Sequence, residues 1–458
     1  MPGTPRDVLA YLDENRERFV SELVEFCRFS SISAVPKYAA DVRRCAEWTA
    51  RHLNAIGVQA TVEETAGHPS VVGEWLKVPG APTVLVYGHH DVQPVDPLDQ
   101  WKTGPFEPTV RDGRLWARGA SDDKGQILAH IKSVEAWLKA AGRLPLNVKF
   151  YIEGEEEFGS RNAPAFVQEH RERLACDIVV VSDGFQFAKG APAITCGMRG
   201  VALYEVVLHG PSQDLHSGVF GGSVSNPAQA LAKLLSALVD GDGRVQVPGF
   251  YDDVAPLEAW EREEYARLPF DEKVYLAGLG VSAPFGEKGY STLERRWVRP
   301  TCDVNGIWGG YQGEGTKTIV PAAAGAKISF RLVPNQIPER IGPALRNFLG
   351  DRLPPGIGME FKEWNAKGAI VYGRDHPAIR AGARAVEAGF GVRPVFIREG
   401  GSVPIVNWFK SVLGADSLLL GWGVPDAQVH SPNENLWLDE FHKSTRACAH
   451  LWAELARV

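Results

Sequence analysis

Residues 81–91 read APTVLVYGHHD, an apolar run that ends in a group of polar side chains. Two further runs share this pattern: residues 148–152 end at a group of acidic residues, and residues 178–181 end at Ser182 and Asp183. Short apolar runs of this kind predict buried strands. Open α/β sheets bind their ligands at the carboxyl ends of such strands. We therefore expect the three runs to bring polar side chains to one edge of a sheet.

Helical patterns alternate with these runs over the first 199 residues. We expect helices near residues 7–29, 40–56 and 126–141. The last of these follows Asp122, so this carboxylate lies where the positive end of a helix favours it. Helices that alternate with β-rich runs predict a largely parallel sheet. The fold class is therefore α/β, with a mixed, mostly parallel sheet and helices on both faces.

The pattern changes after residue 200 and returns near residue 376. The strands and helices expected between them are residues 201–208, 226–239, 325–333, 337–349 and 359–364. Alternating strands with two helices predict a small α+β layer. We therefore predict a catalytic domain formed by residues 1–199 and 371–458, with an α+β domain of residues 200–370 inserted into it.

Composition narrows the class of partner. The 458 residues are 44% hydrophobic and 23% charged, with a formal net charge of -7, as in a globular protein. The chain contains no block of Lys and Arg residues, which argues against nucleic acid or an anionic membrane as the partner. No signal peptide or membrane span is predicted, and the six cysteines form no C-x-x-C pair. We expect a cytoplasmic protein with reduced thiols that acts on a small polar substrate.

Two motifs at the predicted sheet edge suggest metal chemistry. In His89-His90-Asp91, residues two apart lie on the same side of a strand, so Asp91 can orient the His89 imidazole for a metal. A turn histidine with a capping aspartate would show the same letters. The run from Glu155 to Glu157 resembles a solvated acidic surface. At the end of a buried strand, however, three carboxylates need a cation or a proton.

Further motifs follow in a fixed order along the chain. They are YGHHDVQP (87–94), RGASDDKG (118–125), EGEEEFGS (153–160), Ser182-Asp183, HSG (216–218), TKT (316–318), RLVP (331–334), REGGS (398–402) and HSPNE (430–434). In these motifs and in their order, the chain resembles the M20 metallopeptidase family, and within it the carnosinase and cytosolic nonspecific dipeptidase group. The resemblance implies a zinc-peptidase-like catalytic domain with an inserted lid and dimerisation domain.

The resemblance also implies two divalent metal ions, Zn²⁺ or Mn²⁺, in each subunit. The implied ligands are His89, Asp122, Glu157, Asp183 and His430. Asp122 would bridge the ions, with His89 and Asp183 completing one site and Glu157 and His430 the other. Asp123 and Glu155 stand where relatives often have Asn and Met, and we expect both to add negative charge near the metals.

Catalytic and substrate-binding roles follow from the same resemblance. Glu156 would be the general base and acid, acting on a metal-bridged hydroxide. Asp91 would contribute to catalysis by orienting the metal-bound imidazole of His89. The implied substrate-binding residues are His216, Thr318, Arg331, Gly401 and Ser402. His216 would stabilise the oxyanion and, with Thr318, would reach the site of a partner subunit in a homodimer. The Arg331 guanidinium would bind the substrate carboxylate. As isolated features, His216 and Arg331 could equally be a surface loop histidine and an ion-paired strand arginine.

These observations predict a metal-dependent enzyme that hydrolyses dipeptides or short peptides with a free C-terminal carboxylate. An M20-type amidohydrolase that acts on N-acyl or N-carbamoyl amino acids is an alternative within the same class. A non-catalytic protein that binds a peptide or metal on the same fold is an alternative of another class. The presence of Glu156 favours an enzyme, because a binding protein could lose this base at little structural cost.

Overall fold

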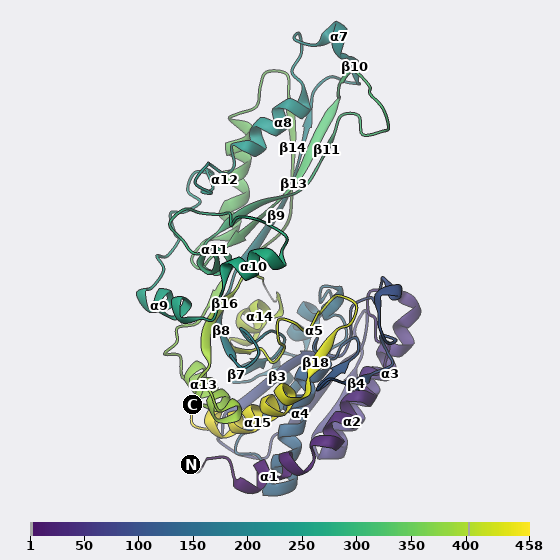
Figure 1. Ribbon diagram of the computed structural model, residues 1–458, viewed down its shortest axis with the longest axis vertical. Coiled ribbons are helices and arrows are strands. Elements are labelled where there is room, and N and C mark those ends of the chain that lie inside the picture. Colours follow the sequence, from purple (N-terminus) through teal and green to yellow (C-terminus); the bar gives the residue numbers. More distant parts are fainter. Residues whose placement is uncertain (1–2, 402–403) are drawn as a thin grey trace. The chain divides into compact units, whose positions relative to one another are not determined.

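The computed structural model describes residues 3–401 and 404–458, and the chain divides into two compact units (Figure 1). The first unit comprises Met1–Cys196, Tyr372–Ile397 and Pro404–Val458. The second unit comprises Gly197–Val371 and Arg398–Val403. The second unit is therefore inserted into the first, and a short segment from the C-terminal part of the chain returns to it.

A nine-stranded sheet of order β1-β2-β6-β3-β7-β17-β8-β15 runs through the first unit, and β16 pairs with β8. Its strands are β1 (Gln59–Glu63), β2 (Ser70–Trp75), β3 (Thr83–His89), β6 (Asn147–Glu153), β7 (Ile178–Val181), β8 (Ala193–Met198), β15 (Ile370–Val371), β16 (Val395–Glu399) and β17 (Asp416–Leu420). The three predicted runs are β6, β3 and β7, which are adjacent and mutually parallel. Their carboxyl ends therefore meet at one edge of the sheet.

Both faces of this sheet are covered, because Val84–Tyr87 of β3 are all completely buried. Val84 and Val86 belong to the main apolar core. On the other face, the Tyr87 ring lies 5.4 Å from the ring of Phe409. The α/β prediction, with a mostly parallel sheet, is confirmed.

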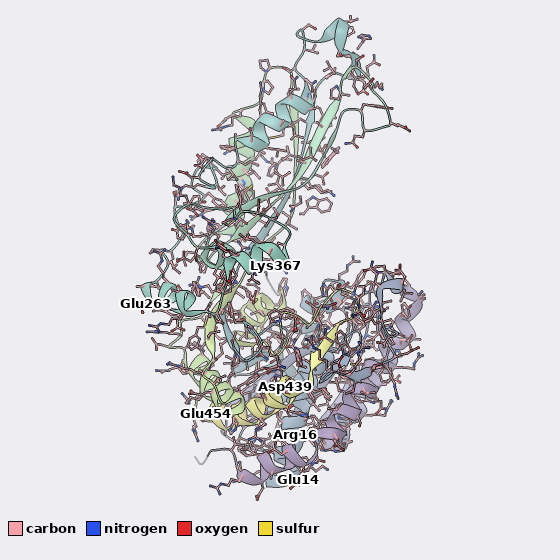
Figure 2. The ribbon with its side chains drawn as sticks, in the orientation of Figure 1. Glu14, Arg16, Glu263, Lys367, Asp439 and Glu454 are labelled. Atoms are coloured by element: carbon pink, nitrogen blue, oxygen red, sulfur yellow. The ribbon has the colours of Figure 1, made fainter. Side chains whose placement is uncertain are left out.

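The helices of the first unit lie near the expected ranges, but the helix expected over residues 7–29 is two helices that meet at Asn15. They are α1 (Arg6–Glu14), α2 (Arg16–Cys27), α3 (Ala39–Ile56), α4 (Lys124–Ala136), α5 (Ala163–Glu169), α6 (Arg171–Leu174), α13 (Pro377–Phe390), α14 (Pro404–Trp408) and α15 (Leu438–Leu455). Every residue of α4 is buried, because this helix packs against β3 as well as α1, α2 and α15. Charged side chains such as Glu14, Arg16 and Asp439 are exposed on the helices that cover it (Figure 2).

Smaller elements complete the first unit. A three-stranded sheet of order β18-β5-β4 contains β4 (Thr109–Arg111), β5 (Arg114–Trp116) and β18 (Asn435–Trp437). A short 3-10 helix, η4 (Glu156–Phe158), follows β6 directly. The loop after β5 leads into α4, so the chain delivers Asp122 beside the carboxyl ends of the central strands.

The second unit contains an antiparallel sheet of order β11-β13-β9-β14. Its elements are β9 (Gly200–His209), β11 (Thr301–Gly309), β13 (Ala323–Leu332), β14 (Gly358–Lys367), α8 (Pro227–Ser236), α9 (Ala259–Arg267), α10 (Glu272–Gly278), α11 (Thr292–Trp297) and α12 (Pro338–Gly350). Alternate residues of β9, from Ala202 to Leu208, form a core with α8 and α12, which lie along one face of the sheet (Figure 1). Asn226 caps α8 by accepting the amide hydrogen of Ala228, as its position before Pro227 favours.

A two-stranded sheet and a short helix lie at one end of the second unit (Figure 1). They are β10 (Leu215–His216), β12 (Ile319–Val320) and α7 (Ser217–Phe220). In neither unit do the described residues form a helix with the length and apolar character needed to cross a bilayer. The six cysteines, all among the described residues, form no disulfide.

Candidate metal centre

Asp122 presents its two carboxylate oxygens to two different histidines. Its Oδ1 atom lies 3.1 Å from His89 Nε2, and its Oδ2 atom lies 3.0 Å from His430 Nε2. His89 ends β3, whereas His430 lies in the loop before β18. The peptide bond between Asp122 and Asp123 is cis.

Two groups of possible metal ligands share this aspartate. One contains His89, Asp122 and Asp183, and the other contains Asp122, Glu157 and His430. In each group one ligand atom from every residue lies within 4.8 Å of the others. Nitrogen and oxygen ligands that are about 2 Å from one ion are about 3 Å from each other. The residues present therefore fit a pair of divalent cations that share one carboxylate.

The electrostatics of the two groups also favour cations. Burial, followed by the nearby Asp122 carboxylate, raises the pKa of Asp183 to about 7. Burial and the Asp183 carboxylate raise the pKa of Glu156 to about 9. Hydrogen bonds to Asp122 and Glu157 raise the pKa of His430 to about 10. Without a cation, these side chains hold protons that a bound metal would displace.

Asp91 connects the first histidine to the glutamate turn. Its Oδ1 lies 3.4 Å from His89 Nδ1. The same carboxylate accepts hydrogen bonds from the backbone amides of Glu156, at 3.2 Å, and Glu157, at 3.1 Å. Ser33 Oγ donates a further bond of 2.6 Å to it. Asp91 therefore fixes both the imidazole and the start of η4.

Two neighbouring side chains turn away from the ligand groups. His90 Nε2 lies 3.0 Å from the Pro69 carbonyl oxygen, because adjacent residues of a strand point to opposite sides. Glu155 accepts hydrogen bonds from the His68 amide and from Asn162 Nδ2. The Glu155 carboxylate therefore joins two loops, and among the described residues it belongs to neither ligand group.

Asp123 does remain near the first group, since its Oδ2 accepts the His89 amide hydrogen at 3.1 Å. Burial and the Asp183 carboxylate raise the pKa of Asp123 well above its usual range, so a proton reduces the charge that it contributes.

Gln93 is a contact that sequence reasoning did not assign. Its Nε2 donates a 2.8 Å hydrogen bond to Glu157 Oε2. The amide fixes one oxygen of a possible metal ligand, as outer contacts of metal sites commonly do. The only signal for it was its place in the motif of residues 87–94.

The remaining predicted site residues that the structure describes all belong to the second unit. His216 and Thr318 are exposed and adjacent, since the Ser217 amide donates to the Thr318 carbonyl oxygen at 3.0 Å. Arg331 is half-buried in β13 and Gly401 is exposed. Ser402 lies outside the described residues. Among the described residues, neither group around Asp122 includes any of these side chains.

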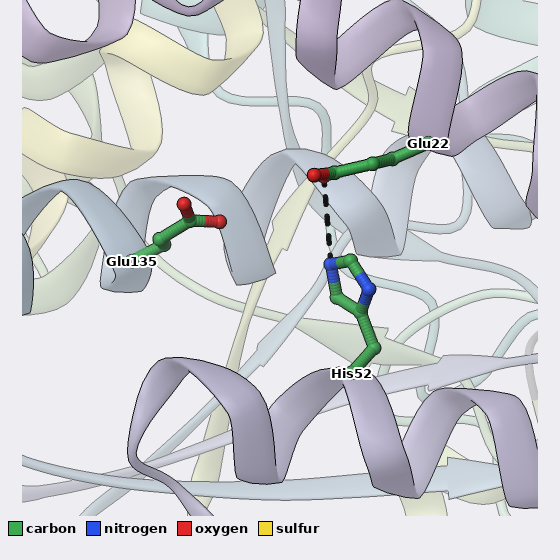
Figure 3. A group of neighbouring side chains, drawn as sticks. All are labelled: Glu22, His52 and Glu135. Carbon is green, nitrogen blue, oxygen red and sulfur yellow. Dashed lines mark ion pairs between the residues drawn. The ribbon is translucent and has the colours of Figure 1, made fainter.

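A third group of possible ligands contains Glu22, His52 and Glu135, from α2, α3 and α4 (Figure 3). Lys132 occupies the position that a cation would need: its Nζ lies 2.5 Å from His52 Nε2 and 2.8 Å from Glu135 Oε2, and it pairs with Glu22. Burial, followed by the Lys132 charge, lowers the pKa of His52 to about 4. This group is therefore a buried ion-pair network that joins three helices.

Comparison with known proteins gives concordant matches. Residues 85–454 match the model of peptidase family M20/M25/M40. The chain is 32% identical to a Cys-Gly metallodipeptidase of Schizosaccharomyces pombe, over 98% of this chain and 97% of that protein.

Solved structures agree with this result. The crystal structure of human carnosine dipeptidase 1 matches with a TM-score of 0.81 and 31% identity, covering 100% of both chains. The structure of an M20 family metallo-carboxypeptidase from Sulfolobus solfataricus matches with a TM-score of 0.80 and 33% identity, over 96% of this chain and 99% of that one.

Proposed function

The chain belongs to peptidase family M20/M25/M40 and is a hydrolase of that family; from this membership we propose that it hydrolyses dipeptides or short peptides with a free C-terminal carboxylate. Two of the similar proteins are dipeptidases by name, a Cys-Gly metallodipeptidase and a carnosine dipeptidase. A third is a metallo-carboxypeptidase by name, and an enzyme of that kind also acts at a free carboxyl end.

The shared carboxylate of Asp122 is the single observation that carries this proposal. His89 and Asp183 would complete the ligands of one divalent cation, and Glu157 and His430 those of a second. Imidazole and carboxylate ligands accept Zn²⁺ or Mn²⁺. When bound, such cations polarise a peptide carbonyl and lower the pKa of water.

We assign Glu156 as the general base and acid. Its carboxylate would accept a proton from the attacking water and would donate it to the leaving amine nitrogen. Asp91 supports this role, because it holds the Glu156 amide at one oxygen and orients His89 with the same carboxylate. Glu156 belongs to neither ligand group among the described residues, so its carboxylate would be available for proton transfer.

Substrate contacts would come from the inserted domain, residues 200–370, and from Gly401 and Ser402. We propose that the Arg331 guanidinium binds the substrate carboxylate, for which its fork geometry is suited. His216 and Thr318 would serve the site of a partner subunit in a homodimer. His216 lies in β10 and Thr318 directly precedes the paired strand β12, and the exposure of both residues supports such a role, because they are accessible to another molecule.

The edge of the second unit's sheet also suits a homodimer. Strand β11 is an edge strand, and its side chains Val304 and Ile307 are 42% and 64% exposed. An exposed edge with apolar side chains is a common site of association. Six cysteines that form no disulfide among the described residues suit a reducing compartment, and we propose a cytoplasmic location.

Removal of metal tests the proposed function directly. The purified chain would be treated with a chelator, assayed on a dipeptide panel that includes Cys-Gly and β-Ala-His, and assayed again after addition of Mn²⁺ or Zn²⁺. We expect activity to be lost and then restored. N-acetyl and N-carbamoyl amino acids serve as contrast substrates, and faster hydrolysis of these would favour the amidohydrolase alternative. Undiminished dipeptide hydrolysis in chelator would refute the proposal.

A further inference from the structure

Glu434 lies four residues after His430 in the sequence and is completely buried. Its carboxylate accepts hydrogen bonds from three backbone amides of the loop before α4. Oε2 accepts from the Gly119 amide at 3.0 Å, and Oε1 accepts from the amides of Ser121, at 3.0 Å, and Asp122, at 3.1 Å. One side chain therefore holds the backbone of the aspartate that both ligand groups share.

The shape of the loop explains why its amides converge on one carboxylate. Gly119 has a φ of 83°, in the left-handed region that glycine adopts without strain. A Cβ atom at this position would lie 2.7 Å from Val92 Cγ1, so space also requires glycine here. Successive amides in such a turn form a concave site for an anion, and in this chain the anion is Glu434.

Arg118 supplies the countercharge for this buried carboxylate. Its Nη1 donates to Glu434 Oε2 at 2.7 Å, and its side chain is 1% exposed. Its Nη2 donates to the Pro94 carbonyl oxygen at 3.0 Å. A buried ion pair is favoured when additional hydrogen bonds hold its partners, as the Pro94 carbonyl oxygen holds Arg118 and the three amides hold Glu434. The pair therefore ties Glu434, which directly precedes β18, to the loop that carries Asp122.

The loop that carries His430 needs such a tie. His430, Gln428 and Asn433 have φ values of 58°, 54° and 67°, which residues with a side chain rarely adopt. Such conformations persist when surrounding contacts fix them. Asn433 Oδ1 accepts the Lys102 amide hydrogen at 2.8 Å, and Glu434 follows directly. Glu434 thus anchors the carboxyl end of a strained ligand loop.

We propose that Glu434 is a positioning residue that couples the two metal sites by fixing Asp122 and the His430 loop relative to each other. Glu434 itself lies in neither ligand group among the described residues. Ser121 adds a second tie between the same segments, since its Oγ donates to the Asn435 carbonyl oxygen at 3.0 Å. The inference rests on the metal centre of the proposed function, and it is independent of the substrate.

Glu434→Gln in the full chain tests the proposal. The glutamine NH2 group would replace one carboxylate oxygen, and as a donor it could not accept from the backbone N–H groups or from Arg118. We expect Mn²⁺ to bind about 10- to 100-fold more weakly, as measured by titration calorimetry, because loss of an outer contact has this size of effect at metal sites. Both cations should be affected, because Asp122 belongs to both ligand groups.

A matched control removes another buried carboxylate that pairs with an arginine. Glu287 accepts hydrogen bonds from Arg299 Nε at 2.7 Å and Nη2 at 2.9 Å, in the second unit. Glu287→Gln should leave Mn²⁺ affinity within about two-fold of the parent. An equal loss of affinity in both variants would show a general structural effect and would overturn the proposal.

Amide hydrogen exchange on the metal-free chain distinguishes local positioning from general loosening. In Glu434→Gln we expect faster exchange at residues 119–122 and 427–435, with the amides of β3 unchanged. Faster exchange throughout the first unit, or unchanged Mn²⁺ affinity, would contradict the inference.

If Glu434→Gln does not fold, Mn²⁺ binding by Ser121→Ala tests the proposal instead. This variant removes only the hydrogen bond from Ser121 Oγ to the Asn435 carbonyl oxygen. It should weaken Mn²⁺ binding about three- to ten-fold, toward the lower end of outer-contact effects, and unchanged affinity would overturn the proposal. These measurements use no substrate. If the chain binds metal as described but hydrolyses no peptide, the proposed function fails while this inference stands.

Discussion

Glu156→Gln separates proton transfer from metal binding. The substitution keeps the backbone amide that donates to Asp91, and Glu156 lies outside both ligand groups among the described residues. Because the pKa of Glu156 is raised to about 9 in the metal-free chain, its carboxyl group is already neutral at pH 7. Replacement by glutamine therefore leaves the charge at this position unchanged in the metal-free protein.

The expected loss of activity follows from the assigned role. General acid and base catalysis contributes about 10²- to 10⁴-fold, which is about 3–5 kcal/mol of transition-state stabilisation. We expect kcat for a dipeptide to fall by this factor at pH 7, with Mn²⁺ stoichiometry unchanged. Steady-state kinetics and metal analysis of the same preparation measure both quantities.

The adjacent glutamate provides the matched control. The Glu155 carboxylate is bound by the His68 amide and Asn162, so Glu155→Gln should retain kcat within about ten-fold while lowering stability by about 1–3 kcal/mol. If Glu156→Gln keeps more than about a tenth of the parent kcat, or if it loses its metal, the assigned role is wrong.

Three further outcomes are expected. In the metal-free chain, the raised pKa values of Asp183, about 7, and His430, about 10, mean that the folded state holds protons that the unfolded state releases. Its Tm should therefore fall as pH rises from 5 to 9, and Mn²⁺ should raise Tm more at pH 8 than at pH 6; a Tm that rises with pH would contradict this linkage. Lys132→Met should destabilise the chain by about 3 kcal/mol, because it removes the buried countercharge of Glu22 and Glu135 and leaves them only the partly exposed Arg18. Metal analysis of this variant should still find the parent stoichiometry, and a lost cation would contradict the separation of the two clusters. His216→Ala should lower kcat about 10²- to 10³-fold, and mixing it with Glu156→Gln should restore activity in mixed dimers; no recovery would count against a shared site.

The central sheet was predictable because its strands are short and almost purely apolar. Runs 81–87, 148–152 and 178–181 became β3, β6 and β7, and the polar residues after them meet at one edge. The spacing of apolar residues could not predict the strand order β6-β3-β7 or the position of β17 beside β7. Packing, and not local sequence, determines which strands are neighbours in a parallel sheet.

The site was less predictable where its geometry depends on the direction in which a side chain points. Glu155, Glu156 and Glu157 are consecutive, yet the Glu155 carboxylate binds the His68 and Asn162 loops. The backbone turn into η4 determines where each carboxylate points, and three identical residues in the sequence contain no signal for that turn. The contacts of Gln93 and Glu434 were missed for a related reason, because each depends on segments distant in sequence.

The central claim is that Asp122 is shared by two cations. The most direct measurement is anomalous scattering from crystals of the chain grown with excess Mn²⁺. The account predicts two peaks, one contacting Asp122 Oδ1, His89 and Asp183, and the other contacting Asp122 Oδ2, Glu157 and His430. A single peak at full occupancy, or two peaks that Asp122 does not join, would contradict it.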